Sequence, residues 1–487
     1  MSVGYATLSA VTFAHSSRTD DTQVPALSAD ELVRLTGGRL LARSERPVRG
    51  GAVDSRLVEP GNVFVALPGE RTDGHRFLPD AAARGAAALL VTRPPEDLAA
   101  LGDVTVIRVA DALAALHAVA TGWRTRFDPL VVGVTGSIAK TSAKEAIATV
   151  LGTRLRTLKN EGNQNNEIGL PLTVLQLGPE HEAAVLEMGM YVGGEIADLA
   201  RIGRPSIGVV TAVQAVHLSR IGSLRAIERA KGELLEALPP SGTGILNADD
   251  PIVRDMAGRT VARTASYGFA EDADVRAEEV ESAGLAGMRF VLRAAGERRP
   301  VKIPTLGRLA VHNGLAAAAV GIAAGFDLDA IVEGLAQGWS APHRGQVVRA
   351  GGVTIVDDSY NASPGSVRAA LDLLGGLPGR RVAVLGEMLE LGDGHIAGHL
   401  DVGEAAAGVV DLLVVVGDEA LAIADGARDA GLDPAKVLLV HDRDAAIDAL
   451  RPRLREGDVV LVKASRGIAL DLLVDALRAE FGGAPAR

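Results

Sequence analysis

Lys140 and Thr141 follow a tight turn that comes directly after a short apolar run, an order typical of a nucleoside triphosphate site. In such a site, backbone N–H groups and a helix N-terminus point at phosphate oxygens. The lysine reaches the outer phosphates, and the threonine hydroxyl can ligate Mg²⁺. The segment LVVGVTGSIAKTS therefore predicts ATP binding. Its candidate ATP-binding residues are Thr135, Gly136, Ser137, Ala139, Lys140, Thr141 and Ser142.

Ala139 stands where a glycine normally precedes the lysine. Glycine is used where the backbone approaches a phosphate closely or takes a positive φ angle, so the added methyl could weaken nucleotide binding. We therefore predict that Ala139→Gly tightens ATP binding. The alternative interpretation of the segment is an ordinary strand–helix turn in an α/β domain, with Lys140 solvated at the start of the helix.

Three further residues are candidates for catalysis or metal binding. Glu187 follows the apolar run 183–186, at the carboxyl end of a predicted strand. His217 follows the run 207–211 after a short loop, and Lys231 lies in the next predicted helix. A carboxylate and an imidazole beside a triphosphate can bind Mg²⁺ or substrate. The alternatives are a hydrogen-bonded surface role for His217 and a solvated helix position for Lys231.

Two polar segments are candidates for substrate binding. The segment NEGNQNNEIGLP at 160–171 begins with four asparagines within seven residues, and Asn163 and Asn166 are its candidate ligands. Its amides can face a sugar, a phosphate or a peptide, although an ordinary turn-rich loop is the alternative. Ser55 and Arg56, side by side, could hold a diphosphate.

The composition bounds the class of protein. The 487 residues are enough for about three domains. The formal net charge of −11 argues against nucleic acid or an anionic membrane as a partner. There is no cysteine, no stretch of transmembrane length and no N-terminal pattern of a signal peptide. We expect a cytoplasmic protein.

The pattern of apolar runs predicts an α/β fold with three domains after a flexible leader at 1–25. The first domain, 26–128, has a helix at 27–41 and strands at 63–67, 87–91 and 104–109. The second, 129–342, combines a mostly parallel sheet with a hairpin at 288–293 and 301–304 and a helix at 312–325. The third, 343–487, has five strands alternating with helices, at 353–356, 382–385, 412–416, 437–440 and 459–462.

This third pattern predicts a parallel, doubly wound sheet. Ligands of such sheets lie beyond the carboxyl ends of the strands. The polar clusters at 357–361, 387–390 and 463–466 lie there and favour a ligand role, whereas His441 and Asp442 are expected to cap a helix.

The motifs in this order and spacing resemble those of the Mur ligase family, over nearly the whole chain after residue 25. The residues that carry the resemblance are DSRLVEPGNVFVAL at 54–67, DGHRF at 73–77, TGSIAKTSAKE at 135–145, NEGNQNNEIGLP at 160–171, EMGMYVGGEI at 187–196, RAKGEL at 229–234, LNADDP at 246–251, VDDSYNASPGSVRAAL at 356–371, VLGEMLELG at 384–392 and VKASRG at 462–467. The resemblance implies a small UDP-sugar-binding domain, a central P-loop-type ATPase domain and a Rossmann-like carboxyl-terminal domain.

The resemblance also implies roles for named residues. Lys140 and Thr141 would hold the ATP phosphates and one Mg²⁺ ion, while Glu187 and His217 would bind a second. Lys231 occupies a position where the family often carries a carbamylated lysine, which would turn a cation into an anion. The remaining implied contacts are Ser55 and Arg56 with the uridine nucleotide, Asn163 and Asn166 with the muramoyl-peptide, Asn313, Arg344 and Asp357 with ATP, and Asp358, Tyr360 and Asn361 with the substrates.

The asparagine loop, the DDSYNASP segment and the GEMLELG segment favour the dipeptide-adding type of this family. The implied reaction joins D-alanyl-D-alanine to UDP-N-acetylmuramoyl-tripeptide with ATP and two Mg²⁺ ions, through an acyl phosphate, in peptidoglycan synthesis, by a monomer. The alternatives are a Mur-like amide ligase of another pathway and a catalytically degenerate protein that binds a UDP-muramoyl peptide.

Three departures from the family pattern accompany the resemblance. Ala139 replaces the glycine of the phosphate turn. Leu309 and Ala310 stand where a His-Asn pair is usual, and Ala464 replaces a glycine in the segment KASRG. The first two departures concern the nucleotide site, so they bear on nucleotide affinity more than on the fold.

Overall fold

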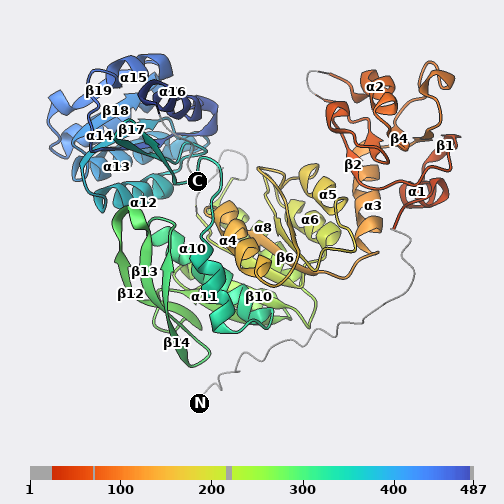
Figure 1. Ribbon diagram of the computed structural model, residues 1–487, viewed down its shortest axis with the longest axis horizontal. Helices are drawn as coiled ribbons and strands as arrows, with labels where there is room; N and C mark the ends of the chain where they lie inside the picture. The colour runs from red at the N-terminus through yellow and green to blue at the C-terminus, as the bar shows by residue number, and fades with distance from the viewer. Residues whose placement is uncertain (1–24, 70–71, 215–221, 483–487) are drawn as a thin grey trace.

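A computed structural model describes residues 25–69, 72–214 and 222–482. The chain forms three sheets that follow one another along the sequence, each covered by helices (Figure 1). This confirms the predicted α/β class with three layered bodies. Residues 1–24, which make up nearly all of the predicted leader, and His217 lie outside the described residues. The exact domain boundaries stay predictions.

The first sheet has five strands in the order β1-β5-β4-β3-β2, and all neighbours are parallel except β1 and β5. Its strands are β1 Arg39–Ala42, β2 Gly51–Ala52, β3 Val63–Val65, β4 Ala88–Val91 and β5 Thr105–Arg108. Its helices are α1 Ala29–Thr36, α2 Leu78–Ala83 and α3 Ala112–Arg124.

The prediction of one helix over 27–41 is wrong in its second half. Helix α1 starts after Ser28, whose side chain forms a capping box with Glu31, and it ends at Thr36. Gly37 follows in the left-handed conformation with φ 63°, which closes the helix. The chain then turns into strand β1, so the glycines at 37 and 38 outweigh the apolar residues beyond them.

The central sheet has nine strands in the order β14-β13-β12-β11-β10-β9-β6-β8-β7. From β7 to β12 all neighbours are parallel, and β13 is antiparallel to both of its neighbours, β12 and β14. The strands are β6 Leu130–Thr135, β7 Thr157–Lys159, β8 Ala183–Glu187, β9 Ile207–Val210, β10 Thr243–Asn247, β11 Arg263–Gly268, β12 Val275–Ser282, β13 Met288–Ala294 and β14 Glu297–Ile303. The predicted hairpin is therefore confirmed, whereas β7, β11 and β12 were not predicted.

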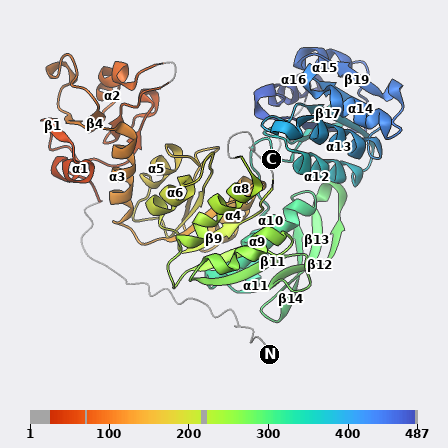
Figure 2. The same ribbon diagram turned by 180° about the vertical axis from the view of Figure 1, so that it is seen from behind.

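Helices cover both faces of the central sheet (Figures 1 and 2). They are α4 Lys140–Gly152, α5 Gly169–Val174, α6 Glu195–Gly203, α8 Leu224–Glu236, α9 Pro251–Asp255, α10 Arg308–Ala323 and α11 Leu328–Gln337. Helix α10 starts one turn before the predicted 312–325, because Leu309, Ala310 and Val311 continue it back to Gly307. Helix α3 of the first body packs with α5 and α6 in one apolar core, which joins the two bodies.

Helix α4 shows how the sequence fixes the phosphate turn in place. Its apolar face is completely buried against the sheet and against α10 and α11. Burial of each large aliphatic side chain stabilises the fold by roughly 1.5–3 kcal/mol. The residues of this face are Ala143, Ala146, Ile147, Val150 and Leu151. The helix N-terminus, with Lys140 and Thr141, is thereby held at the carboxyl end of β6.

The third sheet has six strands in the order β15-β16-β20-β17-β18-β19, parallel except for β15. The strands are β15 Gln346–Ala350, β16 Val353–Asp357, β17 Arg380–Gly386, β18 Leu412–Val416, β19 Val437–Val440 and β20 Asp458–Lys463. The helices are α12 Pro364–Gly375, α13 His395–Ala407, α14 Leu421–Asp429, α15 Arg443–Leu450 and α16 Asp471–Phe481. The five predicted strands are confirmed, and β15 is an addition.

Two further expectations can be compared with the structure. Asp442 caps α15, because its side chain accepts a hydrogen bond from the Ala445 backbone N–H. In the described part of the chain, no helix has both the length and the apolar character needed to cross a membrane.

Candidate active site

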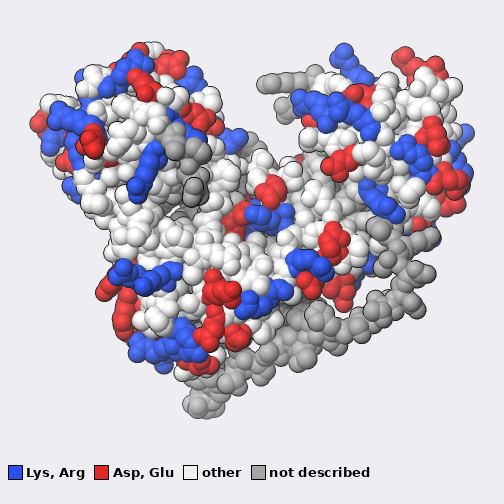
Figure 3. Space-filling view, in the orientation of Figure 1, with Lys and Arg blue, Asp and Glu red and all other residues white. Residues whose placement is uncertain are grey.

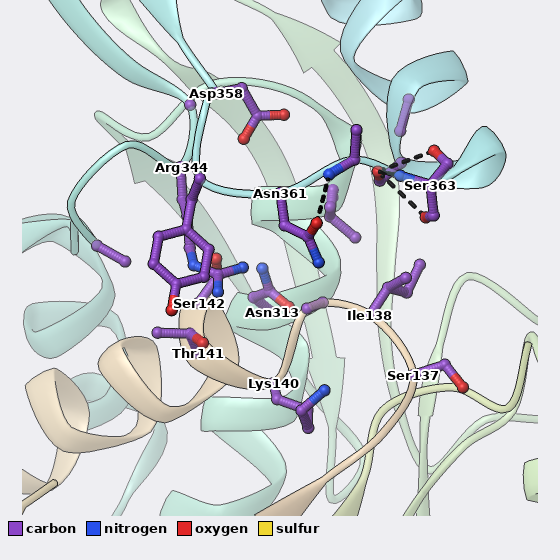
Figure 4. A pocket seen from close by; sticks show the side chains of 18 of the residues that line it. Ser137, Ile138, Lys140, Thr141, Ser142, Asn313, Arg344, Asp358, Asn361 and Ser363 are labelled. Carbon is purple, nitrogen blue, oxygen red and sulfur yellow. Dashed lines mark hydrogen bonds between the residues drawn. The ribbon is translucent and has the colours of Figure 1, made fainter. Parts of the chain in front are cut away.

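A cavity of about 730 Å³ lies where the carboxyl end of the central sheet meets the third sheet. Cavities that hold small-molecule ligands are usually of this size. Figure 4 shows Lys140 and Thr141, from the start of α4, projecting toward the same space as Arg344 and Asn361. The predicted residues that line it are Ser137, Ala139, Lys140, Thr141, Ser142, Asn163, Asn166, Glu187, Asn313, Arg344, Asp358, Tyr360 and Asn361.

The phosphate turn is held rigidly by its own backbone and by the neighbouring strand β9. The Ser137 N–H donates to the Ala212 carbonyl (2.7 Å), and the Ser137 hydroxyl donates to the Gln214 carbonyl (3.0 Å). A Cβ atom at Gly136 would lie 1.9 Å from the Thr211 hydroxyl oxygen, so only glycine fits there. Thr135 is fully buried beneath the turn and donates to the Met188 carbonyl (2.8 Å).

Ala139 adopts the left-handed conformation, with φ 64° and ψ 0°, directly before α4. This backbone costs a non-glycine residue roughly 1–2 kcal/mol. The glycine expected at this position would adopt the same conformation without that cost. The departure at Ala139 therefore keeps the geometry of the turn and stores strain in it.

Lys140 is the cation of the turn. Its Nζ donates to the Gly136 carbonyl (2.7 Å). Burial lowers the pKa of Lys140, nearby Glu187 raises it, and Arg344 lowers it. A partly buried cation at a helix N-terminus favours an anion such as a phosphate.

Glu187, the last residue of β8, has one carboxylate oxygen in use and one free. Its Oε1 accepts a hydrogen bond from Asn165 Nδ2 (2.7 Å). Its Oε2 is buried and has no hydrogen-bond partner within the described ranges. An orphaned buried carboxylate oxygen is costly unless a cation or donor meets it, so it fits a Mg²⁺ ion, which prefers oxygen ligands.

Thr141, which lines the same cavity, adds a hydroxyl oxygen to this donor set. Leaving aside the undescribed segments, the structure contains no group of three His, Cys, Asp or Glu side chains that could hold a metal. The predicted ligand His217 cannot be placed. The metal-binding roles of Thr141, Glu187 and His217 stay predictions.

Lys231 lies on α8 with only 3% of its surface exposed. Burial lowers its pKa well below the ordinary value, Lys140 lowers it further, and Glu187 raises it. Lys231 thus belongs to one electrostatic cluster with two predicted catalytic residues, although it does not line the cavity.

The third sheet contributes an aromatic ring with two cations. The Arg344 guanidinium lies 4.1 Å from the centre of the Tyr360 ring, and the Arg466 guanidinium lies 4.9 Å from it. Lys463 is buried and contacts both Asp358 (Nζ to Oδ2, 2.6 Å) and the Asn361 carbonyl (2.9 Å). The loop that presents Tyr360 and Asn361 is therefore anchored to the end of β20.

Besides Thr135, Gly136 and Lys231, three predicted residues do not line the cavity. Asp357 is 2% exposed, and its carboxylate contacts His343 Nδ1 (2.8 Å) and accepts a hydrogen bond from the Ser359 hydroxyl (2.5 Å). Ser55 and Arg56 lie in the first body, where Arg56 is exposed and pairs with Asp54 (2.6 Å). Any ligand that touches them and the cavity must extend between the bodies.

Asn160 and Asn165 were not among the named candidates, whereas Lys463 and Arg466 were expected as members of the polar cluster at 463–466. The asparagine-rich segment was predicted to bind a ligand, but the sequence did not indicate which of its amides contacts Glu187. Of the departures, Leu309 is 38% exposed on the cavity wall, and Ala464 is fully buried behind it.

Models of Mur ligase domains match most of the chain. The model described as Mur ligase family, catalytic domain, matches residues 48–124. The Mur ligase middle domain matches residues 134–321, and the Mur ligase, glutamate ligase domain matches residues 343–466.

Proteins named UDP-N-acetylmuramoyl-tripeptide–D-alanyl-D-alanine ligase are similar to the chain along most of their length. The protein of Mycobacterium tuberculosis (strain CDC 1551 / Oshkosh) is 39% identical over 470 residues, which cover 88% of this chain and 91% of that protein. The protein of Escherichia coli (strain K12) is 38% identical over 433 residues, which cover 87% and 92%.

Two solved structures share the whole architecture. MurF from Acinetobacter baumannii superposes with a TM-score of 0.85 at 29% identity, covering 94% of this chain and all (100%) of that one. MurF ligase from Thermotoga maritima in complex with ADP gives a TM-score of 0.79 at 30% identity, covering 89% and 98%.

Proposed function

The chain belongs to the Mur ligase family, and we propose that it is the ATP-dependent ligase that joins D-alanyl-D-alanine to UDP-N-acetylmuramoyl-tripeptide in peptidoglycan synthesis. The names of its relatives and the ADP complex of the similar Thermotoga structure support this function. The observation that carries it is the convergence of Lys140, Thr141 and Glu187 with Arg344 and Tyr360 on one cavity.

The reaction has two steps. The terminal carboxylate of the tripeptide attacks the γ-phosphorus of ATP, which gives an acyl phosphate and releases ADP. The amine of D-alanyl-D-alanine then attacks the acyl carbon, phosphate leaves with the former carboxylate oxygen, and the nitrogen loses a proton. Negative charge gathers on the phosphoryl group in both steps, and Lys140 together with the N–H groups of the turn stabilises it.

Positioning supplies a large part of the rate, because three substrates must meet in line. The cavity walls come from two bodies: the turn and Glu187 from the central sheet, and Arg344 and Tyr360 from the third. Closure of these bodies over the substrates would exclude water from the acyl phosphate.

In the proposed site, Thr141 would hold one Mg²⁺ ion, and Glu187 together with His217 would hold a second. When bound, these ions would supply positive charge that stabilises the transferring phosphoryl group. The buried Oε2 of Glu187, which has no hydrogen-bond partner among the described residues, supports this assignment.

We further propose that Lys231 is carbamylated. A neutral lysine amine attacks CO₂ and loses a proton to become a carbamate anion, so a buried lysine with a lowered pKa is suited to the reaction. The product would place an anion beside Lys140. Mass spectrometry of the intact, rapidly sampled protein would detect the added carboxyl group, and Lys231→Ala would remove it.

The substrates would span the molecule. Ser55 and Arg56 would face the uridine nucleotide, and Asn163 and Asn166 the muramoyl-peptide, with Asp358 and Asn361 beside the incoming dipeptide. The proposed domains are 26–128 for UDP-muramoyl binding, 129–342 for ATP binding and 343–487 for the Rossmann-like part. We propose a monomer that works in the cytoplasm.

The test is phosphate release by the purified chain with ATP, Mg²⁺ and UDP-N-acetylmuramoyl-tripeptide, with and without D-alanyl-D-alanine. Release that requires the dipeptide, with a product whose mass equals both substrates less water, is expected. Release only with another amine would favour a Mur-like ligase of another pathway. Binding of the UDP-muramoyl-tripeptide without any release would favour a degenerate binding protein.

A further inference from the structure

The main-chain N–H and carbonyl of Glu187 are both bound by a single side chain. Asn160 follows the last residue of β7, where the β7–β8 ladder ends. Its Oδ1 accepts from the Glu187 N–H (2.9 Å), and its Nδ2 donates to the Glu187 carbonyl (3.0 Å). The amide thus replaces the two main-chain bonds that a longer β7 would make, and it fixes the point from which the carboxylate projects.

Asn160 is in turn fixed by helix α4. Lys144 lies one turn beyond Lys140, and its Nζ donates to the Asn160 carbonyl (2.5 Å). Lys144 is 0% exposed and Asn160 is 1% exposed, so water does not compete for this contact. One continuous path therefore runs from the helix that carries the phosphate turn, through Lys144 and Asn160, to Glu187.

The charge of Lys144 is balanced within the same cluster. Lys144 Nζ lies 2.9 Å from Glu145 Oε1, and Lys159 Nζ lies 2.5 Å from Glu145 Oε2. The acidic partner is therefore shared by two lysines. Removal of either lysine leaves Glu145 paired with the other, so neither removal strands a buried carboxylate.

The two lysines differ in one respect. Lys144 contacts the Asn160 carbonyl, whereas the contacts of Lys159 within the cluster are with Glu145 and, at 3.9 Å, Glu161. Charge balance alone therefore does not explain Lys144, since Lys159 could neutralise Glu145 unaided. Lys144 adds a hydrogen-bonded connection, through Asn160, between α4 and the end of β8.

We propose that Lys144 is a positioning residue: through Asn160 it sets the free carboxylate oxygen of Glu187 at a fixed place relative to the phosphate turn. This inference rests on the proposed function, because it presumes that Glu187 faces a divalent cation bound with the nucleotide. The two groups that must meet that cation and the phosphates, Glu187 and the N-terminus of α4, then move as one unit.

The test compares Lys144→Met with Lys159→Met in the full chain. Both substitutions remove one ammonium group from Glu145, but only the first breaks the path to Glu187. With Mn²⁺ as the probe, Lys144→Met should bind the ion in the presence of ADP about 10-fold more weakly, the usual effect of losing a group that orients a metal ligand. Metal-free ADP binding should stay within about 2-fold, and kcat should fall together with kcat/KM.

Lys159→Met should match the unsubstituted chain in Mn²⁺ binding, measured by the electron paramagnetic resonance signal of the free ion. Equal losses in both variants, or none in a folded Lys144→Met, would overturn the proposal. Should Lys144→Met fail to fold, Asn160→Ala carries the same expectation, since it leaves every charge in place. Failure of the proposed function differs, because the unsubstituted chain would then show no dipeptide-dependent turnover.

Discussion

Arg344 lies over the ring of Tyr360, 4.1 Å from its centre, and Arg466 faces the same ring at 4.9 Å. All three residues line the cavity, and Arg466 follows β20 while Tyr360 follows β16, which is its neighbour in the sheet. One ring is therefore shared by two cations. This places concentrated positive charge opposite the phosphate turn, where phosphoryl oxygens and a substrate carboxylate would gather.

We expect Tyr360→Leu to lower kcat/KM for the ligation about 10-fold. Loss of two cation–π contacts, each worth about 0.5–2 kcal/mol, frees both guanidinium groups. Tyr360→Phe keeps the ring and should retain most of the activity. Steady-state kinetics with varied ATP and varied dipeptide measures the effect, and a Phe variant as weak as the Leu variant would show that the hydroxyl matters instead.

Ala139→Gly should raise the free energy of unfolding by about 1 kcal/mol, because it relieves the left-handed backbone at φ 64°. It should also tighten ATP binding, since the methyl group no longer stands in the turn. Ala295→Gly is the control, because Ala295 also has a positive φ (52°) but lies in the β13–β14 turn. Urea unfolding should show a gain in both variants, and an ATP titration a gain in the first alone. Unchanged or weaker ATP affinity in Ala139→Gly would contradict the prediction.

We expect the fold to lose stability in acid because of His399. Its ring is fully buried, and its Nε2 accepts a hydrogen bond from the Met388 N–H (3.0 Å), so Nδ1 carries the proton and donates to the His395 carbonyl (2.7 Å). Burial lowers the pKa of His399 below 6.5, the backbone contact at His395 raises it, the His395 ring lowers it and Glu387 raises it. The unfolded chain therefore takes up a proton first, and stability is complete above pH 6.5 and falls below it.

The urea concentration at the unfolding midpoint should accordingly decrease as the pH is lowered from about 7.5 to about 5.5. His399→Gln offers an acceptor to Met388 without titrating, so its midpoint should depend less on pH. His441→Gln is the control, since His441 is exposed and should leave the dependence unchanged. An equally steep dependence in His399→Gln would assign the effect to other groups.

Lys463→Met should destabilise the fold by about 3 kcal/mol. The ammonium group is buried and meets three acceptors: Asp358 Oδ2, the Asp358 carbonyl and the Asn361 carbonyl. Removal of one partner from a buried ion pair leaves the other uncompensated. Lys436→Met, at an exposed lysine, should change stability by less than about 0.5 kcal/mol in the same urea experiment.

The distribution of charge over the rest of the surface does not indicate a charged binding partner. On the face drawn in Figure 3, lysine and arginine side chains are interspersed with aspartate and glutamate. Mixed charge of this kind does not attract one class of charged partner.

The sequence predicts local structure well where the pattern is periodic. The phosphate turn, helix α4 and the five parallel strands of the third sheet follow directly from apolar spacing. The prediction for helix α1 fails at its end because Gly37 closes the helix before the apolar spacing ends. Among the strands that were missed, β7 and β15 are short, and β11 and β12 are poor in apolar residues.

The asparagine segment shows where sequence reasoning stops. Four asparagines stand within seven residues, and nothing local distinguishes them. Asn160 and Asn165 meet Glu187 only because β7 and β8 lie side by side. Asn166 instead accepts from the Gly169 N–H (2.9 Å) at the start of α5. The choice among equal residues is made by tertiary contacts between segments far apart in the chain.

The most direct test of the proposed reaction measures whether a carboxylate oxygen of the tripeptide appears in the released phosphate. UDP-N-acetylmuramoyl-tripeptide carrying ¹⁸O in its terminal carboxylate is ligated with unlabelled ATP and D-alanyl-D-alanine, and the released phosphate is analysed by mass spectrometry. A ligase that works through an acyl phosphate transfers one ¹⁸O atom to each phosphate. Unlabelled phosphate would mean that water, not the tripeptide carboxylate, attacks ATP, and it would contradict the proposed reaction.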